Sequence, residues 1–191
     1  ARARGALRAC GADLAAHCIN DVITTGAEPL FLLDYVAANR IELEQVAELV
    51  EGAAEVCRDA GVALIGGETA ELPGIYQEHE LDFAGTCVGI VDAERLVDGS
   101  RIAEGDAVVG LPSAGVHANG FTLVRRVLEQ EDYTGEDLLA PTRLYLDDVR
   151  RLRDSAHAFA HVTGGGILGN LSRAVPAGLA AEIDWKAWER P

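Results

Sequence analysis

Apolar residues recur at two different spacings in the first half of the chain. They recur every three or four positions over residues 12–25 and 42–60, and a glycine follows each run, which predicts two helices that end at these glycines. Short and mostly apolar runs predict strands at residues 30–37, 62–65 and 81–91. Helices and strands therefore alternate along this half, and the fold class expected is a mixed α/β fold.

The second half begins after a charged stretch that contains the turn signal Asp98-Gly99. We therefore expect one domain over residues 1–100 and another over residues 101–191. Two segments are expected to lack regular structure, namely the lead-in at residues 1–11 and an acidic surface excursion at residues 131–137. In the second domain the pattern predicts strands at residues 106–111, 156–163 and 179–184, and helices at residues 121–129, 142–153 and 167–174.

Composition narrows the class of protein. The chain has 191 residues, 49% of them hydrophobic, which is enough to form a core. Its 16 Lys and Arg residues against 31 Asp and Glu leave a net charge of −15, which argues against nonspecific binding to nucleic acid or to anionic membranes. No apolar run is long enough for a membrane span. The chain contains no methionine, even at position 1, so we expect it to be an internal piece of a longer polypeptide.

The four cysteines bear on the cellular compartment. They show no C-x-x-C spacing, and they fall within predicted helices and a predicted strand. We expect reduced core thiols, with neither a zinc site nor a disulfide framework. Together with the absence of a signal sequence from this piece, this pattern predicts a cytoplasmic protein.

A glycine–carboxylate stretch follows the strand predicted at residues 62–65. Gly66 and Gly67 would let the backbone approach a ligand, and Glu68, Thr69 and Glu71 follow directly. Carboxylates repel phosphate unless a divalent cation lies between them, so this stretch indicates a metal–phosphate site. A surface turn after a strand explains the same residues equally well.

Other candidate residues lie on a helix and in two glycine-containing loops. Asn20 and Asp21 fall beside the apolar stripe of the first predicted helix, where they would line a cleft or simply face solvent. His117 lies between Gly115 and Gly120 in the loop before the helix at residues 121–129, and it is either functional or structural. The second loop, residues 164–166, consists of three glycines and follows His161, and its entropic cost favours a ligand-facing role over a filler turn.

Five segments, taken in order, resemble the phosphoribosylformylglycinamidine cyclo-ligase family, also called aminoimidazole ribonucleotide synthetase. The resemblance covers residues 12–184, and five co-linear motifs are far more specific than any one glycine loop. The motifs are residues 20–21 (Asn-Asp), 26–30 (Gly-Ala-Glu-Pro-Leu), 66–74 (Gly-Gly-Glu-Thr-Ala-Glu-Leu-Pro-Gly), 113–121 (Ser-Ala-Gly-Val-His-Ala-Asn-Gly-Phe) and 161–166 (His-Val-Thr-Gly-Gly-Gly).

The resemblance implies an ATP-driven ring closure in purine biosynthesis. ATP would phosphorylate the amide oxygen of formylglycinamidine ribonucleotide, and the neighbouring nitrogen would attack the iminophosphate and release phosphate. It also implies an N-terminal domain of sheet and helices that pairs with a second copy into a dimeric barrel, and a partial C-terminal α/β domain. The expected ligands are therefore ATP, Mg²⁺ and the substrate, in a homodimer.

The resemblance also implies roles for individual residues. The catalytic residues expected on the substrate side are His117 and His161, whose imidazoles suit proton transfer near neutrality. Mg-ATP is expected to contact Asn20, Asp21, Gly66, Gly67, Glu68 and Thr69, with the metal held by Asp21 and Glu68. Substrate binding is expected at Ser113, Gly115, Asn119, Gly120, Thr163, Gly164 and Gly165.

The chain also departs from the family pattern. The glycine-rich segment with a Gly-Thr-Lys that opens the family does not precede residue 12, and Lys186 is the sole lysine. The later part of the second domain is missing too, so this piece is expected to be inactive by itself. The alternatives are another ATP-using member of the superfamily, such as formylglycinamidine ribonucleotide synthetase, thiamine-monophosphate kinase, selenophosphate synthetase or the hydrogenase-maturation enzyme, and a noncatalytic dimerising module.

Overall fold

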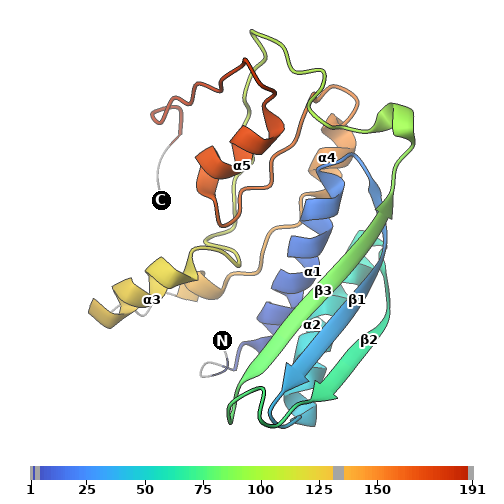
Figure 1. The fold of residues 1–191 in the computed structure, drawn as a ribbon, viewed down its shortest axis with the longest axis vertical. Coiled ribbons are helices and arrows are strands. Elements are labelled where there is room, and N and C mark those ends of the chain that lie inside the picture. The colour runs from blue at the N-terminus through green and yellow to red at the C-terminus, as the bar shows by residue number, and fades with distance from the viewer. Residues whose placement is uncertain (1, 3–4, 131–135, 189–191) are drawn as a thin grey trace.

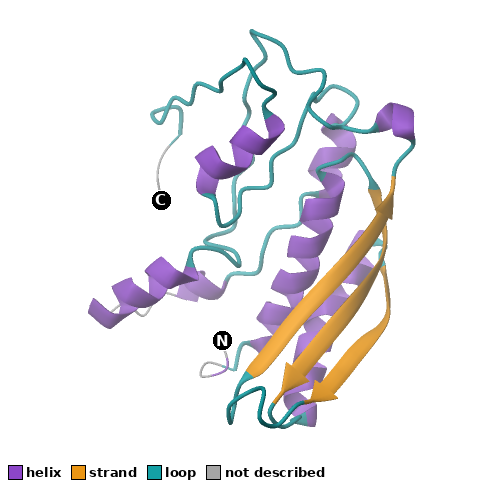
Figure 2. Ribbon diagram, viewed as in Figure 1, coloured by secondary structure: helices purple, strands orange, loops and turns teal. Residues whose placement is uncertain are grey.

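The first half of the chain forms a three-stranded sheet with two helices packed on one face. The computed structural model describes residues 2, 5–130 and 136–188. Helices and strands alternate along this half, as predicted (Figures 1 and 2). The elements are α1 (Leu7–Ile23), β1 (Glu28–Ala38), α2 (Leu43–Ala60), β2 (Ala63–Glu71) and β3 (Leu81–Ile90). The prediction of an irregular lead-in over residues 1–11 is wrong from Leu7 onward, because α1 begins there and Leu7 is buried.

The strand order is β2-β1-β3, with β1 parallel to β2 and antiparallel to β3. Helices α1 and α2 contact each other through their backbones, because a Cβ atom on Gly11 would lie 1.9 Å from the carbonyl oxygen of Leu49. The same is true of Gly52, where a Cβ would lie 1.9 Å from the carbonyl oxygen of Arg8. The two glycines therefore set how closely the helices approach. The core beneath them includes Ile19, Ile23 and Leu32.

The glycine–carboxylate stretch is a strand and not the loop that the sequence predicted. Strand β2 continues through Gly66 and Gly67 to Glu71, because β1 offers ladder partners as far as Ala38. The pairing slips by one residue between Leu64 and Gly66, so Ile65 forms a β-bulge. Gly66 has a φ of 133°, a conformation that glycine adopts readily. The glycines therefore allow the bulge in this edge strand.

The sheet face opposite the helices is open and partly apolar. Exposure alternates along β3, where Phe83, Gly85 and Cys87 turn toward the helices and the residues between them are exposed. Leu33, Val88 and Ile90 are exposed apolar residues of this sheet. All four cysteines of the chain are free thiols, as predicted.

The second half contains helices but no strand among the residues that the structure describes. Its helices are α3 (Phe121–Gln130), α4 (Leu146–Leu152) and α5 (Gly166–Ala174), with a short 3-10 segment at Glu136–Leu139. Another 3-10 segment, Ala93–Arg95, follows β3 at the end of the first half. The helices predicted at residues 121–129 and 167–174 are confirmed. Of the acidic excursion predicted at residues 131–137, residues 131–135 lie outside the described part of the chain.

The strands predicted at residues 106–111, 156–163 and 179–184 are wrong, since these segments run as irregular chain. A strand needs a neighbour to take up its backbone hydrogen bonds, and none of the described residues pairs with these three segments. Helix α4 begins at Leu146 and not at residue 142, and side chains of α1 bind the backbone N–H groups of Thr142 and Tyr145 before it. In the described part of the chain, no helix is long and apolar enough to span a membrane.

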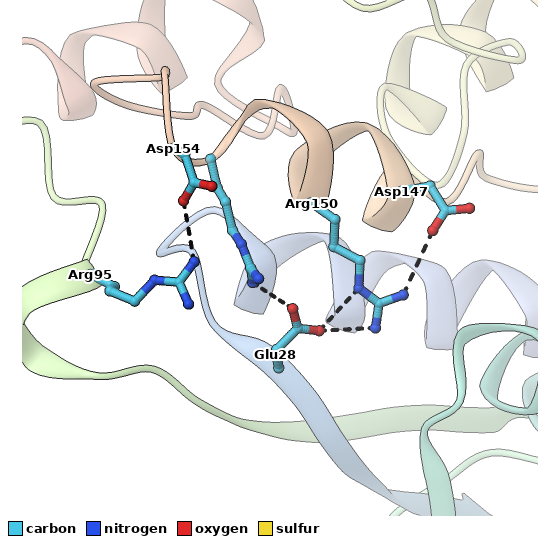
Figure 3. A network of polar contacts seen from close by, with 6 residues as sticks. Glu28, Arg95, Asp147, Arg150 and Asp154 are labelled. Atoms are coloured by element: carbon cyan, nitrogen blue, oxygen red, sulfur yellow. Dashed lines mark hydrogen bonds and ion pairs between the residues drawn. The ribbon is translucent and has the colours of Figure 1, made fainter.

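An ionic network joins α4 to the start of β1. The carboxylate of Glu28 accepts hydrogen bonds from Arg150 Nε and Nη2 at 3.1 and 2.9 Å, and it also pairs with Arg153 at 2.5 Å. Figure 3 shows Arg150 reaching both Glu28 and Asp147, while Arg95 pairs with Asp154 nearby. The contacts of Glu28 bridge residues more than a hundred positions apart and fasten the second half to the sheet.

Candidate functional site

A cavity of about 310 Å³, with a mixed polar and apolar lining, lies where α1, α5 and two irregular segments meet. Asp21 comes from the last turns of α1, and His161 and Thr163 come from the segment before the glycine loop. The remaining lining residues are Thr24, Thr25, Val97, Asp98, Gly99, Ala158, Phe159, Ala160, Asn170, Arg173 and Ala174. The structure thus brings two of the predicted motifs, residues 20–21 and 161–166, to one cavity.

Asp21 and His161 form a carboxylate–imidazole pair on this cavity. His161 Nδ1 lies 2.7 Å from Asp21 Oδ1, and the His161 side chain is only 9% exposed while that of Asp21 is 59% exposed. An ionised carboxylate only accepts hydrogen bonds, so Nδ1 carries the proton and Nε2 is the basic nitrogen. The pair can therefore hold one tautomer of His161 and support proton transfer at Nε2.

His17 joins this pair from one turn earlier in α1. Its Nε2 lies 3.9 Å from Asp21 Oδ2, and its ring centroid lies 5.1 Å from that of His161. The buried Nδ1 of His17 has no hydrogen-bond partner in the described structure. Sequence reasoning missed His17, although its spacing of four residues from Asp21 places both on one helix face.

The glycine loop after His161 is shaped by Asn170. Asn170 is buried, and its Nδ2 donates to the carbonyl oxygen of Gly166 at 2.8 Å while its Oδ1 accepts from Thr163 Oγ1 at 3.2 Å. Gly166 has a φ of 63°, so a side chain there would be strained. Gly164 and Gly165 precede the first turn of α5. Sequence reasoning missed Asn170, whose signal was its position four residues after the last glycine.

His117 is buried and held by backbone donors. Its Nε2 accepts hydrogen bonds from the backbone N–H of Ala114 at 3.0 Å and of Arg143 at 3.4 Å. Burial lowers the pKa of His117 below its usual value, and the nearby His161 and His17 lower it further, whereas Asp13 opposes the shift. The ring is therefore neutral with its proton on Nδ1, which is the one nitrogen left to donate. Its φ of 53° is unusual for a residue with a side chain.

The other residues predicted around His117 belong to the same turn. Asn119 donates its backbone N–H to the carbonyl oxygen of Val116 at 3.3 Å, and the carbonyl oxygen of Gly120 accepts from Leu123 at the start of α3. Gly120 has a φ of 76°, which glycine tolerates best. Ser113 and Gly115 are exposed in the preceding stretch. This turn therefore presents an exposed backbone beside a buried imidazole.

Asn20 is fully engaged by the backbone of another segment. It is only 2% exposed, its Nδ2 donates to the carbonyl oxygen of Arg143 at 2.8 Å, and its Oδ1 accepts from the N–H of Tyr145 at 3.0 Å. These contacts account for the burial of the amide. Asn20 therefore joins the two halves of the chain beside the cavity.

The second group of predicted nucleotide residues lies elsewhere. Gly66, Gly67, Glu68 and Thr69 lie on β2, at the sheet edge away from β3, and none of them lines the cavity. Gly67 has a packing reason of its own, because a Cβ there would lie 1.8 Å from the carbonyl oxygen of Asp34. Burial raises the pKa of the Asp34 carboxyl. The carboxylate of Glu71 accepts from the backbone N–H of Ile41 at 2.8 Å.

The predicted metal pair is not assembled in this chain. Asp21 is engaged by His161, and Glu68 is exposed on a separate strand. Within residues 2, 5–130 and 136–188, no group of three or more His, Cys, Asp or Glu side chains is arranged to hold a metal ion. No contact within the described part of the chain joins Asp21 to Glu68.

Comparison with known proteins places both halves in one family. Residues 5–91 match the model described as AIR synthase related protein, N-terminal domain, and residues 103–191 match the model of its C-terminal domain. A phosphoribosylformylglycinamidine cyclo-ligase from Nitrosococcus oceani is 50% identical over 192 residues, which cover 94% of this chain and 54% of the relative. One from Anaeromyxobacter dehalogenans is 51% identical over 195 residues, covering 95% of this chain and 56% of the relative. The chain spans a little over half the length of these curated relatives.

Solved structures share the fold at low sequence identity. A thiamine-monophosphate kinase from Stenotrophomonas maltophilia superposes with a TM-score of 0.59 at 22% identity, covering 86% of this chain and 54% of that one. AaThiL complexed with AMPPCP and TMP gives a TM-score of 0.54 at 21% identity, covering 80% and 48%. At this identity the similarity shows a common fold and nothing further.

Proposed function

Because the chain belongs to the AIR synthase related protein family, we propose that the full-length protein cyclises formylglycinamidine ribonucleotide to 5-aminoimidazole ribonucleotide with ATP, in purine biosynthesis. The relatives named phosphoribosylformylglycinamidine cyclo-ligase, at about half identity, support this reading over the kinases that share only the fold. The observation that carries it is the Asp21–His161 pair on the cavity, which joins two of the motifs.

The proposed chemistry has two steps. ATP transfers its terminal phosphoryl group to the amide oxygen of the substrate, and the neighbouring nitrogen then attacks the activated carbon and expels phosphate. Ring closure releases a proton from the attacking nitrogen. We assign its acceptance to His161 Nε2, because Asp21 fixes the proton of the resting imidazole on Nδ1 and stabilises the imidazolium that forms.

His117 has a different role in this proposal. Its Nε2 is occupied by two backbone donors, so it cannot accept a proton from substrate without losing them. The remaining Nδ1–H is suited to donate a hydrogen bond. We therefore assign His117 to substrate orientation, beside the exposed turn that carries Ser113, Gly115, Asn119 and Gly120, and we assign Thr163, Gly164 and Gly165 to the substrate as well.

The nucleotide is proposed to lie along the edge of β2. There Gly66 and Gly67 expose the backbone, and Glu68 and Thr69 are accessible. Mg²⁺ commonly uses one or two carboxylates together with phosphate oxygens, so Glu68 is the better candidate ligand, because Asp21 is already paired. AaThiL, which shares the fold, is a complex with AMPPCP, so this fold accommodates an ATP analogue.

The open sheet face supports the proposed homodimer. Leu33, Val88 and Ile90 would be buried if two sheets packed face to face. In the full-length protein, Val88→Glu is expected to convert a dimer into a monomer in sedimentation experiments, whereas Glu94→Gln, outside the sheet, should leave the dimer intact. A monomeric parent protein would refute this part. The free thiols agree with a reducing compartment such as the cytoplasm.

The activity is tested on the full-length protein with ATP, Mg²⁺ and formylglycinamidine ribonucleotide. Phosphate release should match formation of the imidazole product one to one. Thiamine monophosphate serves as the competing substrate. Turnover of thiamine monophosphate without turnover of formylglycinamidine ribonucleotide would assign the protein to the kinases instead.

A further inference from the structure

Residues 142–145 lie between α1 and the turn that carries His117, and they contact both. On one side, two side chains of α1 hold the segment. Asp13 Oδ1 accepts from the backbone N–H and the Oγ1 of Thr142 at 2.6 and 2.7 Å, and Asn20 binds the backbone of Arg143 and Tyr145. Asp13 and Asn20 lie two helical turns apart, so they share one face of α1.

On the other side, the same segment holds the His117 turn. Arg143 donates its backbone N–H to His117 Nε2 and its Nη1 to the carbonyl oxygen of Pro112, at 3.4 and 3.2 Å. The hydroxyl of Tyr145 donates to the same carbonyl oxygen at 3.0 Å, and its ring centroid lies 6.3 Å from that of His117. These contacts of the segment thus connect α1 to the His117 turn.

The segment is itself ordered by burial and charge. Thr142 is 6% exposed and Leu146, which follows the segment, is 3% exposed. The guanidinium of Arg143 pairs with Asp148 at 2.7 Å and lies 5.0 Å from the centre of the Tyr145 ring. Helix α4 begins directly after the segment, at Leu146, and the backbone N–H groups of Thr142 and Tyr145 are satisfied by Asp13 and Asn20.

We propose that residues 142–145 form a positioning bridge: they are bound to α1 on one side and hold His117 in place on the other. Thr142 and Tyr145 are accordingly positioning residues for His117, and Asp13 is their anchor on the helix that also carries Asp21. The effect on activity rests on the proposed function, whereas the effect on the His117 imidazole does not. The bridge explains how the His117 turn, which lies outside the sheet, keeps a fixed position relative to the Asp21–His161 pair.

A double-mutant cycle in the full-length protein tests the bridge. Thr142→Val keeps the shape of the side chain but removes its hydroxyl donor, and it should lower kcat/KM about tenfold, the cost of a small misplacement. Thr142→Ser, which keeps the hydroxyl donor, should have the kcat/KM of the unchanged protein. In a His117→Ala background the same Thr142→Val change should cost less than about twofold, because its effect passes through His117. Equal losses in both backgrounds would overturn the proposal.

A spectroscopic measurement separates the bridge from the proposed reaction. With ¹⁵N-labelled histidine, Thr142→Val and Tyr145→Phe should each shift the imidazole resonances of His117 and leave those of His157 unchanged. His157 pairs with Asp106 outside the bridge. Val36→Ala, which truncates a buried residue of β1, controls for general loss of stability and should leave His117 unshifted. Unshifted His117 resonances in both bridge variants would refute the bridge even if the cyclisation is confirmed, and shifted ones would support it even if no cyclisation occurs.

Discussion

The two halves of this chain differ in how each one is stabilised. In the first, Leu32 and Val36 of the sheet are fully buried under α1 and α2. In the second, α3 has no buried residue, and Leu123 and Leu168 are 67% and 70% exposed. Of the second half, Leu146 and Val149 of α4 are buried in the main core, and the partly buried Leu144, Tyr145 and Phe159 pack against it. The first half therefore has an apolar core of its own, while the second is attached to it through α4, a few partly buried apolar residues and polar contacts.

This difference matters for the candidate site. Asp21 is presented by a helix packed in the core, whereas His161 lies on irregular chain of the second half. A carboxylate on a packed helix thus faces an imidazole on a segment that is attached by Phe159 and by polar contacts. The site should respond to changes in those attachments more than to changes elsewhere in the second half.

The largest effect is expected at the imidazole itself. His161→Ala in the full-length protein should lower kcat by about 10²–10⁴-fold, the usual contribution of a general base. His157→Ala is the matched control, because this exposed histidine of the same segment pairs with Asp106 away from the cavity. Steady-state kinetics of phosphate release measure both. An unchanged kcat in His161→Ala would remove His161 from the chemistry.

The second largest effect is expected on stability, where core substitutions in the first half should cost more than substitutions in the second half. Leu32→Ala should lower the free energy of unfolding by about 2–5 kcal/mol, because it leaves a cavity in the core. Leu168→Ala, at a largely exposed position of α5, should change it by about 0.5 kcal/mol or less. Urea unfolding of the full-length protein measures both. Equal costs would show that the second half buries its apolar residues as the first does.

Asp21→Asn should have a smaller effect on catalysis than loss of His161. The amide keeps the size of the side chain but no longer stabilises an imidazolium, so kcat should fall about 10–100-fold. The Mg²⁺ concentration needed for half-maximal rate should stay unchanged in Asp21→Asn and rise in Glu68→Gln. A raised Mg²⁺ requirement in Asp21→Asn with an unchanged one in Glu68→Gln would show that Asp21, and not Glu68, binds the metal.

The smallest effect is expected at the ionic attachment of α4. Glu28→Gln should cost about 1 kcal/mol or less, because the carboxylate is partly solvated. Hydrogen bonding from Arg150, helped by Arg153, holds the pKa of Glu28 below its usual value. Its contribution is therefore complete above the ordinary glutamate pKa of about 4.3 and is lost as the pH falls through the lower folded pKa.

Unfolding of Glu28→Gln and of the unchanged protein at a series of pH values measures this contribution. The two free energies should differ near neutral pH and converge in acid. Glu94→Gln, at an exposed carboxylate after β3, is the control and should show no such convergence. A difference that persists below the folded pKa would mean that Glu28 acts through packing instead of charge.

Local sequence signals were sufficient for the elements of the first half. The apolar periodicity of α1 and α2, with a glycine after each, and the apolar runs of β1 and β3 are properties of neighbouring residues, so they could be predicted without a partner. The prediction failed where a neighbour decided the outcome. Residues 66–71 became strand because β1 offered a ladder, and residues 106–111 did not because no described strand lies beside them.

The motifs likewise pointed to residues but not to their partners. Asp21 and His161 were both candidates from the sequence, yet their 2.7 Å contact joins positions 140 residues apart. Asp13, His17 and Asn170 carry no motif of their own, and they gained their roles only through the groups that folding brought to them.

The sequence by itself determined the class of fold, the helices of both halves and the family resemblance, because these follow from local spacing and residue order. The tertiary structure alone decided that Asp21 meets a histidine and not Glu68, and that side chains of α1 bind residues 142–145 just before α4. Hydrogen bonds depend on distance and direction in space, and neither is encoded in the spacing of residues so far apart along the chain.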